Sequence, residues 1–269
     1  MLLAVLSAKL AAIIAIALAT PVCAIEQTSS PTTEKLFERV LPLVPPATSV
    51  PQELQVVAGD RIVAIGDSIT AEGAYLRYIE QVLAFHYPEL RNLKIINAGI
   101  GSQKSENLLA RFDRDVIVRR PTFVIINIGI NDVWHRLSEP HNFDFLRGYH
   151  DNITTMVTMA QQAGIHVILL SPTIIEEKLD AEGNQRLERY ASVMGKIAAL
   201  KKIQFVDLHA MFCSAIERNP RSQNKGWLTS DGVHMRPLGS ALMALGVLRA
   251  LGVPDATTAA TEIVVAPRQ

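Results

Sequence analysis

Five nearly continuous apolar segments alternate with longer segments of helical pattern over the middle of this chain. The apolar segments cover residues 61–66, 94–99, 123–129, 166–172 and 203–208. The segments of helical pattern cover residues 73–86, 105–118, 143–163, 185–201 and 237–251. An apolar run without strict alternation is typical of a strand that is covered on both faces. The chain therefore predicts an α/β fold, in which helices cover both faces of a mainly parallel sheet.

Three polar turns follow the first three predicted strands. Ser68 lies just beyond the first strand, the turn of residues 97–103 follows the second, and Asn131 follows the third. Ligands of open parallel sheets bind outside the carboxyl ends of the strands. We therefore expect the three turns to meet at one edge of the sheet and to form a site there.

The first 24 residues predict a secretory leader. They contain one positive charge, at Lys9, followed by a run of apolar residues, and they end in the small residues "VCA". This arrangement is typical of a signal peptide, here cleaved after Ala24, and it predicts export to the periplasm or the medium. Because the leader carries little positive charge, an uncleaved membrane anchor is the alternative.

The remaining chain divides into three parts by composition. Residues 25–59 are rich in Pro, Ser and Thr and predict an N-terminal extension or linker, with a short helix around residues 34–40. Residues 60–252 contain the alternating strands and helices and form the predicted domain. Residues 253–269, which are rich in Ala and Thr, predict a loose C-terminal tail.

The serine after the first strand, Ser68, is a candidate nucleophile. A serine hydroxyl becomes nucleophilic when a neighbouring base accepts its proton and a third group orients that base. Asp231 and His234 stand three positions apart, which brings a carboxylate to an imidazole within one turn. Asp132 and His135 have the same spacing. Spacing alone does not choose between the two pairs.

Acyl transfer also requires hydrogen-bond donors aimed at the oxygen on which negative charge develops. The candidates are the backbone N–H of Ser68, an N–H of the glycine turn at residues 99–102, and the side-chain amide of Asn131. By itself, an Asn-Asp turn after a strand is typical of local capping. Its place at the same sheet edge as the serine favours the functional interpretation.

Four sequence blocks carry a resemblance to a known family. The blocks "IGDSIT", "NAGIGS", "GIND" and "DGVH" occur in the order and spacing of the GDSL esterases, also called SGNH hydrolases. The resemblance spans about residues 60–250 and implies a three-layer α/β/α sandwich with a flavodoxin-like sheet. It implies that Ser68 is the nucleophile, that Asp231 and His234 complete a catalytic triad, and that Asn131 helps to form the oxyanion hole. It thereby favours this Asp-His pair over its rival.

The second block departs from the family pattern at one position. The family pattern is Asn-x-Gly-Ile-x-Gly, whose last glycine donates its backbone N–H, and in this chain that position is Ser102. A backbone donor survives a change of side chain, but a Cβ narrows the site if the turn requires a positive φ. The donor from this block is therefore either Ser102 or Gly101.

Asp67, Trp134 and His135 are candidates for the lining of the substrate pocket. Asp67 is expected to organise the turn before the serine rather than to react. For Trp134 and His135, packing at the edge of the sheet is the alternative. The histidines show no zinc-binding spacing, and the glycines lack a phosphate-binding fingerprint, so we predict neither a metal nor another cofactor.

Together these features predict an exported carboxylic ester hydrolase. It would remove acyl groups, in particular acetyl groups, from small-molecule or carbohydrate esters through an acyl-enzyme. One alternative is a lysophospholipase or thioesterase on the same scaffold, and another is a catalytically silent carbohydrate-binding domain. The chain has 26 acidic and 26 basic residues and no long basic run, so no nucleic-acid partner is expected, since such proteins usually carry a basic face. If the leader is cleaved, no stable membrane insertion is expected.

Overall fold

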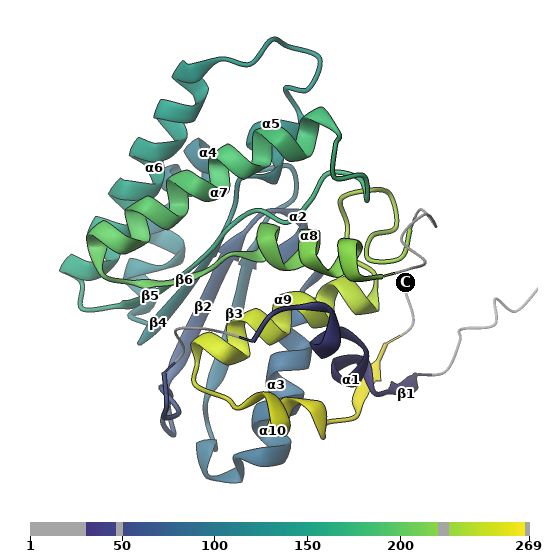
Figure 1. Cartoon of the computed structure of the whole chain (residues 1–269). Helices are drawn as coiled ribbons and strands as arrows, with labels where there is room; N and C mark the ends of the chain where they lie inside the picture. Colours follow the sequence, from purple (N-terminus) through teal and green to yellow (C-terminus); the bar gives the residue numbers. More distant parts are fainter. Residues whose placement is uncertain (1–30, 47–50, 220–225, 267–269) are drawn as a thin grey trace, which may run out of the picture.

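A five-stranded parallel sheet forms the centre of the protein, for which the computed structural model describes residues 31–46, 51–219 and 226–266 (Figure 1). The strands are β2 (Arg61–Gly66), β3 (Lys94–Gly99), β4 (Phe123–Asn127), β5 (His166–Leu170) and β6 (Gln204–Val206). They lie in the order β3-β2-β4-β5-β6, which is the flavodoxin-like order. The α/β prediction is therefore confirmed, whereas the predicted signal peptide at residues 1–24 lies outside the described residues.

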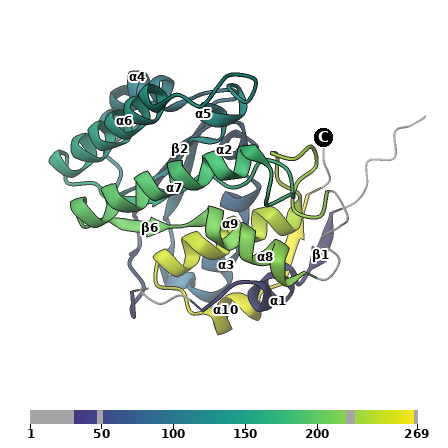
Figure 2. The same ribbon diagram turned by 45° about the horizontal axis from the view of Figure 1, so that its top comes forward.

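Helices cover both faces of this sheet (Figures 1 and 2). One face carries α1 (Leu36–Val40), α3 (Ala74–His86), α8 (Leu208–Arg218) and α9 (Pro237–Ala250). The other face carries α4 (Ser105–Asp115), α6 (Phe143–Gln162) and α7 (Glu182–Lys201). Two short helices, α2 (Ser68–Glu72) and α5 (Ile130–Trp134), follow β2 and β4 directly. The fold thus has the three predicted layers, with its functional turns at the carboxyl ends of the strands.

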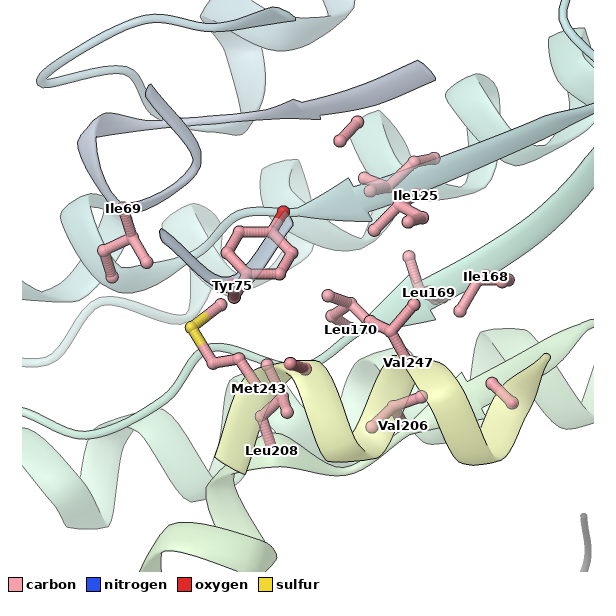
Figure 3. Packing of buried hydrophobic residues seen from close by; sticks show 14 of the residues in the cluster. Ile69, Tyr75, Ile125, Ile168, Leu169, Leu170, Val206, Leu208, Met243 and Val247 are labelled. Atoms are coloured by element: carbon pink, nitrogen blue, oxygen red, sulfur yellow. The ribbon is translucent and has the colours of Figure 1, made fainter. Parts of the chain in front are cut away.

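Helix α9 is the most deeply buried helix of the first face, with every residue from Leu238 to Ala250 buried. A helix that is apolar on all sides belongs inside a protein core. Figure 3 shows Val247 of this helix beside Leu169 and Leu170 of the sheet, and Met243 of the same helix beside Tyr75. Because α9 follows the segment that contains Asp231 and His234, this burial fixes the C-terminal end of that segment.

The C-terminal segment is ordered, so the prediction of a loose tail is wrong for residues 253–266. It forms α10 (Asp255–Ala259) and β7 (Ile263–Val265). Strand β7 pairs antiparallel with β1 (Thr32–Glu34), and the side chain of Ile263 is buried in the core. The partner strand lies more than 200 positions earlier in the chain, which no local composition can indicate.

Part of the predicted N-terminal extension also belongs to the packed body. The short helix expected around residues 34–40 is α1, and its residues Leu36, Phe37 and Val40 are buried. They pack with α9, so this part of the chain is not a free linker. Within the residues that the structure describes, no helix is both long enough and apolar enough to span a membrane.

Candidate active site

Ser68 lies at the point where the strand order reverses. Strand β2 has β3 on one side and β4 on the other, and crevices at such reversals bind the ligands of open sheets. Asp67 ends the strand and caps α2, since its side chain accepts a hydrogen bond from the N–H of Ile69 at 3.0 Å. Gly66 permits this tight exit, because a Cβ there would lie 2.2 Å from Thr70 Oγ1. The serine hydroxyl thus lies at the carboxyl end of β2, between β3 and β4.

Ser68, His234 and Asp231 form one continuous chain of hydrogen bonds. His234 Nε2 lies 2.9 Å from Ser68 Oγ, and His234 Nδ1 lies 2.6 Å from Asp231 Oδ2. The other oxygen of Asp231 accepts the backbone N–H groups of His234 at 2.8 Å and Val233 at 3.0 Å. Burial raises the pKa of Asp231, but these hydrogen bonds outweigh it and hold the pKa at about 2. A carboxylate that is charged at neutral pH therefore orients the imidazole toward the serine.

The second Asp-His pair, Asp132 and His135, is arranged differently. The Asp132 carboxylate turns toward the start of α4, where it accepts the Ser105 hydroxyl at 2.7 Å and the Ser105 N–H at 3.1 Å. Burial raises its pKa to about 6, and the hydrogen bonds from Ser105 oppose that rise. Across the described part of the chain, no hydrogen bond or ion pair joins Asp132 to His135. This carboxylate instead anchors the helix that follows the second turn.

The second and third turns meet beside Ser68. Gly101 of the second block lies beside Ser68, since a Cβ built on it would lie 4.0 Å from Ser68 Cβ. Ser102 adopts a φ of 61°, the left-handed conformation that glycine takes most easily. Asn131 is buried, and its Nδ2 donates to the carbonyl of Gln103 at 3.0 Å, which uses one of its two N–H groups. The three predicted turns therefore converge, and the turn requires a positive φ at position 102 although the residue there is a serine.

Gly99 fixes the distance between the second turn and α2. A Cβ at this position would lie 2.2 Å from the backbone nitrogen of Ala71. We therefore expect Gly99→Ala to destabilise the fold by about 1–3 kcal/mol through overpacking. The midpoint of urea unfolding measures this loss, and Gly101→Ala, whose Cβ has space, is the matched control. Equal midpoints for both variants would contradict this view of the turn.

Trp134 lies beside the imidazole of His234. Their ring centroids are 6.3 Å apart, and the rings meet edge to face at 78°. His135 lies further out, where it is exposed and contacts Trp134 at 5.6 Å between centroids. Burial, together with the charges of Lys104 and Arg136, lowers the pKa of His135. Of the three predicted pocket residues, Asp67 is buried under the turn before the serine, and Trp134 is the one whose ring contacts the imidazole of the proposed base.

Arg111, which no sequence motif indicates, holds the first two turns together. This buried guanidinium donates to the carbonyls of Gly66 at 3.0 Å and Ala98 at 2.8 Å, at the ends of β2 and β3. It also donates to the Gln103 side chain at 2.6 Å. Its other partner is the carboxylate of Asp115 at 2.9 Å, one helical turn further on, and such a pair on a helix does not by itself indicate contact with two strand ends. No group of three or more His, Cys, Asp or Glu side chains in the described ranges could hold a metal ion.

With this geometry in place, the family can be stated. The sequence pattern of the GDSL-like Lipase/Acylhydrolase family matches residues 64–242, and the chain belongs to that family. Its relatives include esterases, and the chain is a carboxylic ester hydrolase.

Two relatives are similar over most of their length. An acetylxylan esterase of Geobacillus stearothermophilus is 29% identical over 217 residues, which are 74% of this chain and 97% of that protein. Esterase TesA of Pseudomonas aeruginosa is 23% identical over 186 residues, which are 67% of this chain and 82% of that protein.

Solved structures agree with this similarity. The crystal structure of the Geobacillus acetylxylan esterase matches with a TM-score of 0.67 and 28% identity, over 75% of this chain and 98% of that one. An α/β hydrolase from the metagenome of Lake Arreo, Spain, matches with a TM-score of 0.66 and 26% identity, over 75% and 99% of the two chains. Three other structures of the Geobacillus enzyme are of catalytic mutants, in which a serine, an aspartate or a histidine is replaced by alanine. That aspartate and that histidine stand three positions apart.

Proposed function

We propose that this protein is a serine esterase that removes acetyl groups through an acyl-enzyme formed on Ser68. The observation that carries the proposal is the continuous bond chain from Ser68 through His234 to Asp231, at 2.9 and 2.6 Å. The catalytic mutants of the Geobacillus relative support it, because their aspartate and histidine have the spacing of Asp231 and His234. The silent carbohydrate-binding alternative finds no support in this geometry.

The reaction follows from the order of the hydrogen bonds. His234 Nε2 accepts the proton of Ser68 Oγ as that oxygen attacks the ester carbonyl carbon. The charged carboxylate of Asp231 stabilises the resulting imidazolium, which then gives its proton to the departing alcohol oxygen. A water molecule next attacks the acyl-enzyme with His234 as its base, which releases the acid and restores Ser68.

Attack on the ester carbonyl forms a tetrahedral intermediate with negative charge on its oxygen. Hydrogen-bond donors that are already in place stabilise this charge. In this proposal they are the backbone N–H groups of Ser68 and Gly101 and the second N–H of the Asn131 amide. The place of Gly101 beside Ser68 supports it as the donor from the second block, and Ser102 is the alternative donor.

Acetylated carbohydrate is the proposed substrate, which the similarity to acetylxylan esterase supports. The test compares acetylated xylo-oligosaccharides, aryl acetates, longer acyl esters and lysophospholipids by kcat/KM. We expect acetyl esters to give the highest values and a fluorophosphonate probe to label the protein. A clear preference for long acyl chains would favour the lysophospholipase or thioesterase alternative, and absence of both turnover and labelling would contradict the esterase.

Asn131→Ala should lower kcat by about 10²–10³-fold, the usual loss for one side-chain donor of an oxyanion hole. KM should change less, because the interaction strengthens as charge develops on the oxygen. Steady-state kinetics on an aryl acetate measure both constants. A rise in KM at constant kcat would reassign Asn131 to binding of the ground state.

Export through the leader at residues 1–24 is part of the proposal, with Ile25 as the first residue of the mature chain. N-terminal sequencing of the protein from the exported fraction tests it. A chain that keeps its leader in the membrane fraction would instead support the uncleaved anchor.

A further inference from the structure

The loop that supplies Asp231 and His234 is held by one distant carboxylate. Glu177 lies on the connection between β5 and α7, about 50 positions earlier in the chain. Its Oε1 accepts the N–H of Leu228 at 2.8 Å, the N–H of Thr229 at 2.7 Å and the hydroxyl of Thr229 at 2.9 Å. Its Oε2 accepts the N–H of Trp227 at 3.0 Å. Residues 227–229 form the first arm of the loop, and four of their donors therefore converge on the side chain of Glu177.

A carboxylate is suited to this contact. It carries two oxygens that accept only, with room for about four hydrogen bonds, and its charge strengthens each of them. Leu228 and Thr229 are almost completely buried, at 0% and 1% exposure. Without Glu177, their N–H groups would have to find other partners away from bulk water, and the arm would have to move.

The arm that Glu177 holds is paired with the arm that carries His234. Thr229 forms an antiparallel bridge with Met235. The N–H of Ser230 donates to the carbonyl of His234 at 2.8 Å, and the N–H of Arg236 donates to the carbonyl of Leu228 at 2.7 Å. A displacement of the first arm would therefore move the imidazole as well.

The tip of the same loop is held from the neighbouring position. The N–H of Glu176 donates to the carbonyl of Gly232 at 2.7 Å. Gly232 stands between Asp231 and His234 in the sequence. Gly232 has a φ of 95°, and a Cβ there would lie 3.4 Å from the backbone of Glu176. Two adjacent residues after β5 thus contact both the base and the tip of the loop.

We propose that Glu177 is a positioning residue that sets the place of His234 and Asp231 relative to Ser68. This inference rests on the proposed function, in which these three residues react. Glu177 touches none of the reacting atoms, so it acts through the loop. Its effect is therefore expected in the chemical step and not in the binding of the ester.

Glu177→Ala should lower kcat by about 10- to 100-fold, since small displacements of reacting groups cost this much, while KM stays nearly constant. Glu177→Gln should recover most of the rate, because its carbonyl oxygen can accept the three bonds made to Oε1. Asp180→Asn removes an exposed carboxylate of the same connection and is the control, with kinetics like those of the wild type. Urea unfolding of each variant reports the integrity of the fold.

A double-mutant cycle separates positioning from a general structural role. If Glu177 acts by placing the base, adding Glu177→Ala to His234→Ala should lower the residual rate by less than about twofold, because groups that act as one unit are strongly non-additive. Should Glu177→Ala not fold, Glu177→Asp replaces it in the cycle, since its shorter carboxylate keeps the charge but withdraws from the donors.

Two results would overturn the inference: wild-type kcat in both Glu177→Ala and Glu177→Asp, or a loss as large in the His234→Ala background as in the wild type. Failure of the proposed function is distinct from either. It would appear as full activity in Ser68→Ala, or as no turnover by the wild-type protein.

Discussion

Ester hydrolysis should fall by about 10⁵–10⁶-fold in Ser68→Ala, with the fold intact, because removal of a nucleophile leaves only the catalysis of the remaining site. The lost oxygen is the atom that lies 2.9 Å from His234 Nε2. Its removal deletes no buried contact of the core, since Ser68 is half-buried at the first turn of α2. Hydrolysis of an aryl acetate measures the loss of activity, and labelling by a fluorophosphonate measures the loss of the nucleophile. The midpoint of urea unfolding shows whether the fold is intact.

Ser102→Ala is the matched comparison for this variant. It removes a second hydroxyl from the same sheet edge but keeps the backbone N–H and the side-chain Cβ. We expect the fluorophosphonate to label Ser102→Ala and not Ser68→Ala. Hydrolysis at the wild-type rate in Ser68→Ala would exclude the acyl-enzyme mechanism.

His234→Ala should be nearly as inactive as Ser68→Ala, because the serine then has no group to accept its proton. Combining the two substitutions should cost little more than either one, since both belong to one catalytic unit. His135→Ala should instead change substrate preference with a smaller loss of rate, since this side chain reaches the site only through Trp134. The measurement is kcat/KM for each variant across the ester panel.

The pH profile gives an independent comparison of the two histidines. The acidic limb of kcat/KM reports the base of the free enzyme. That limb should persist in His135→Ala. In the wild-type protein the imidazole of His135 has a lowered pKa and no carboxylate partner among the described residues. An inactive His135→Ala together with an active His234→Ala that keeps the limb would transfer the role to the pair at Asp132 and His135.

The architecture could be predicted because apolar runs and helical patterns are local properties. The exact ends of the strands could not be predicted in this way, since they depend on where the chain leaves the sheet. The third strand ends at Asn127 rather than at residue 129, because Gly129 has already turned, with a φ of 127°. The fifth ends at Val206, because Asp207 caps the following helix. The order of the strands came from family resemblance, as periodicity contains no information on which strands are neighbours.

The candidate site could be predicted to the extent that sheet topology gathers strand ends at one edge. Ser68 and Asn131 follow from that rule, and so does the meeting of their turns. The choice between two Asp-x-x-His pairs does not, because it depends on where a loop far along the chain folds back. In the structure the Asp132 carboxylate binds Ser105, a contact that spacing alone could not distinguish from a pairing with histidine.

The supporting side chains could not be found from the sequence at all. Arg111 and Glu177 bind backbone groups, and backbone groups leave no trace in the residue types of their partners. In the sequence, such a guanidinium or carboxylate therefore looks like any other charged residue of a helix or a connection. Such residues become visible only when the carbonyls and N–H groups they contact have been placed.

The antiparallel pairing of β1 with β7 brings the two ends of the described chain to one corner (Figure 1). A segment attached before Thr32 and one attached after Val265 would leave the protein side by side. The register has a mechanical consequence. Force applied through both ends would act first on the pair Thr32 and Val265. The backbone pairs between β1 and β7 would then break one after another.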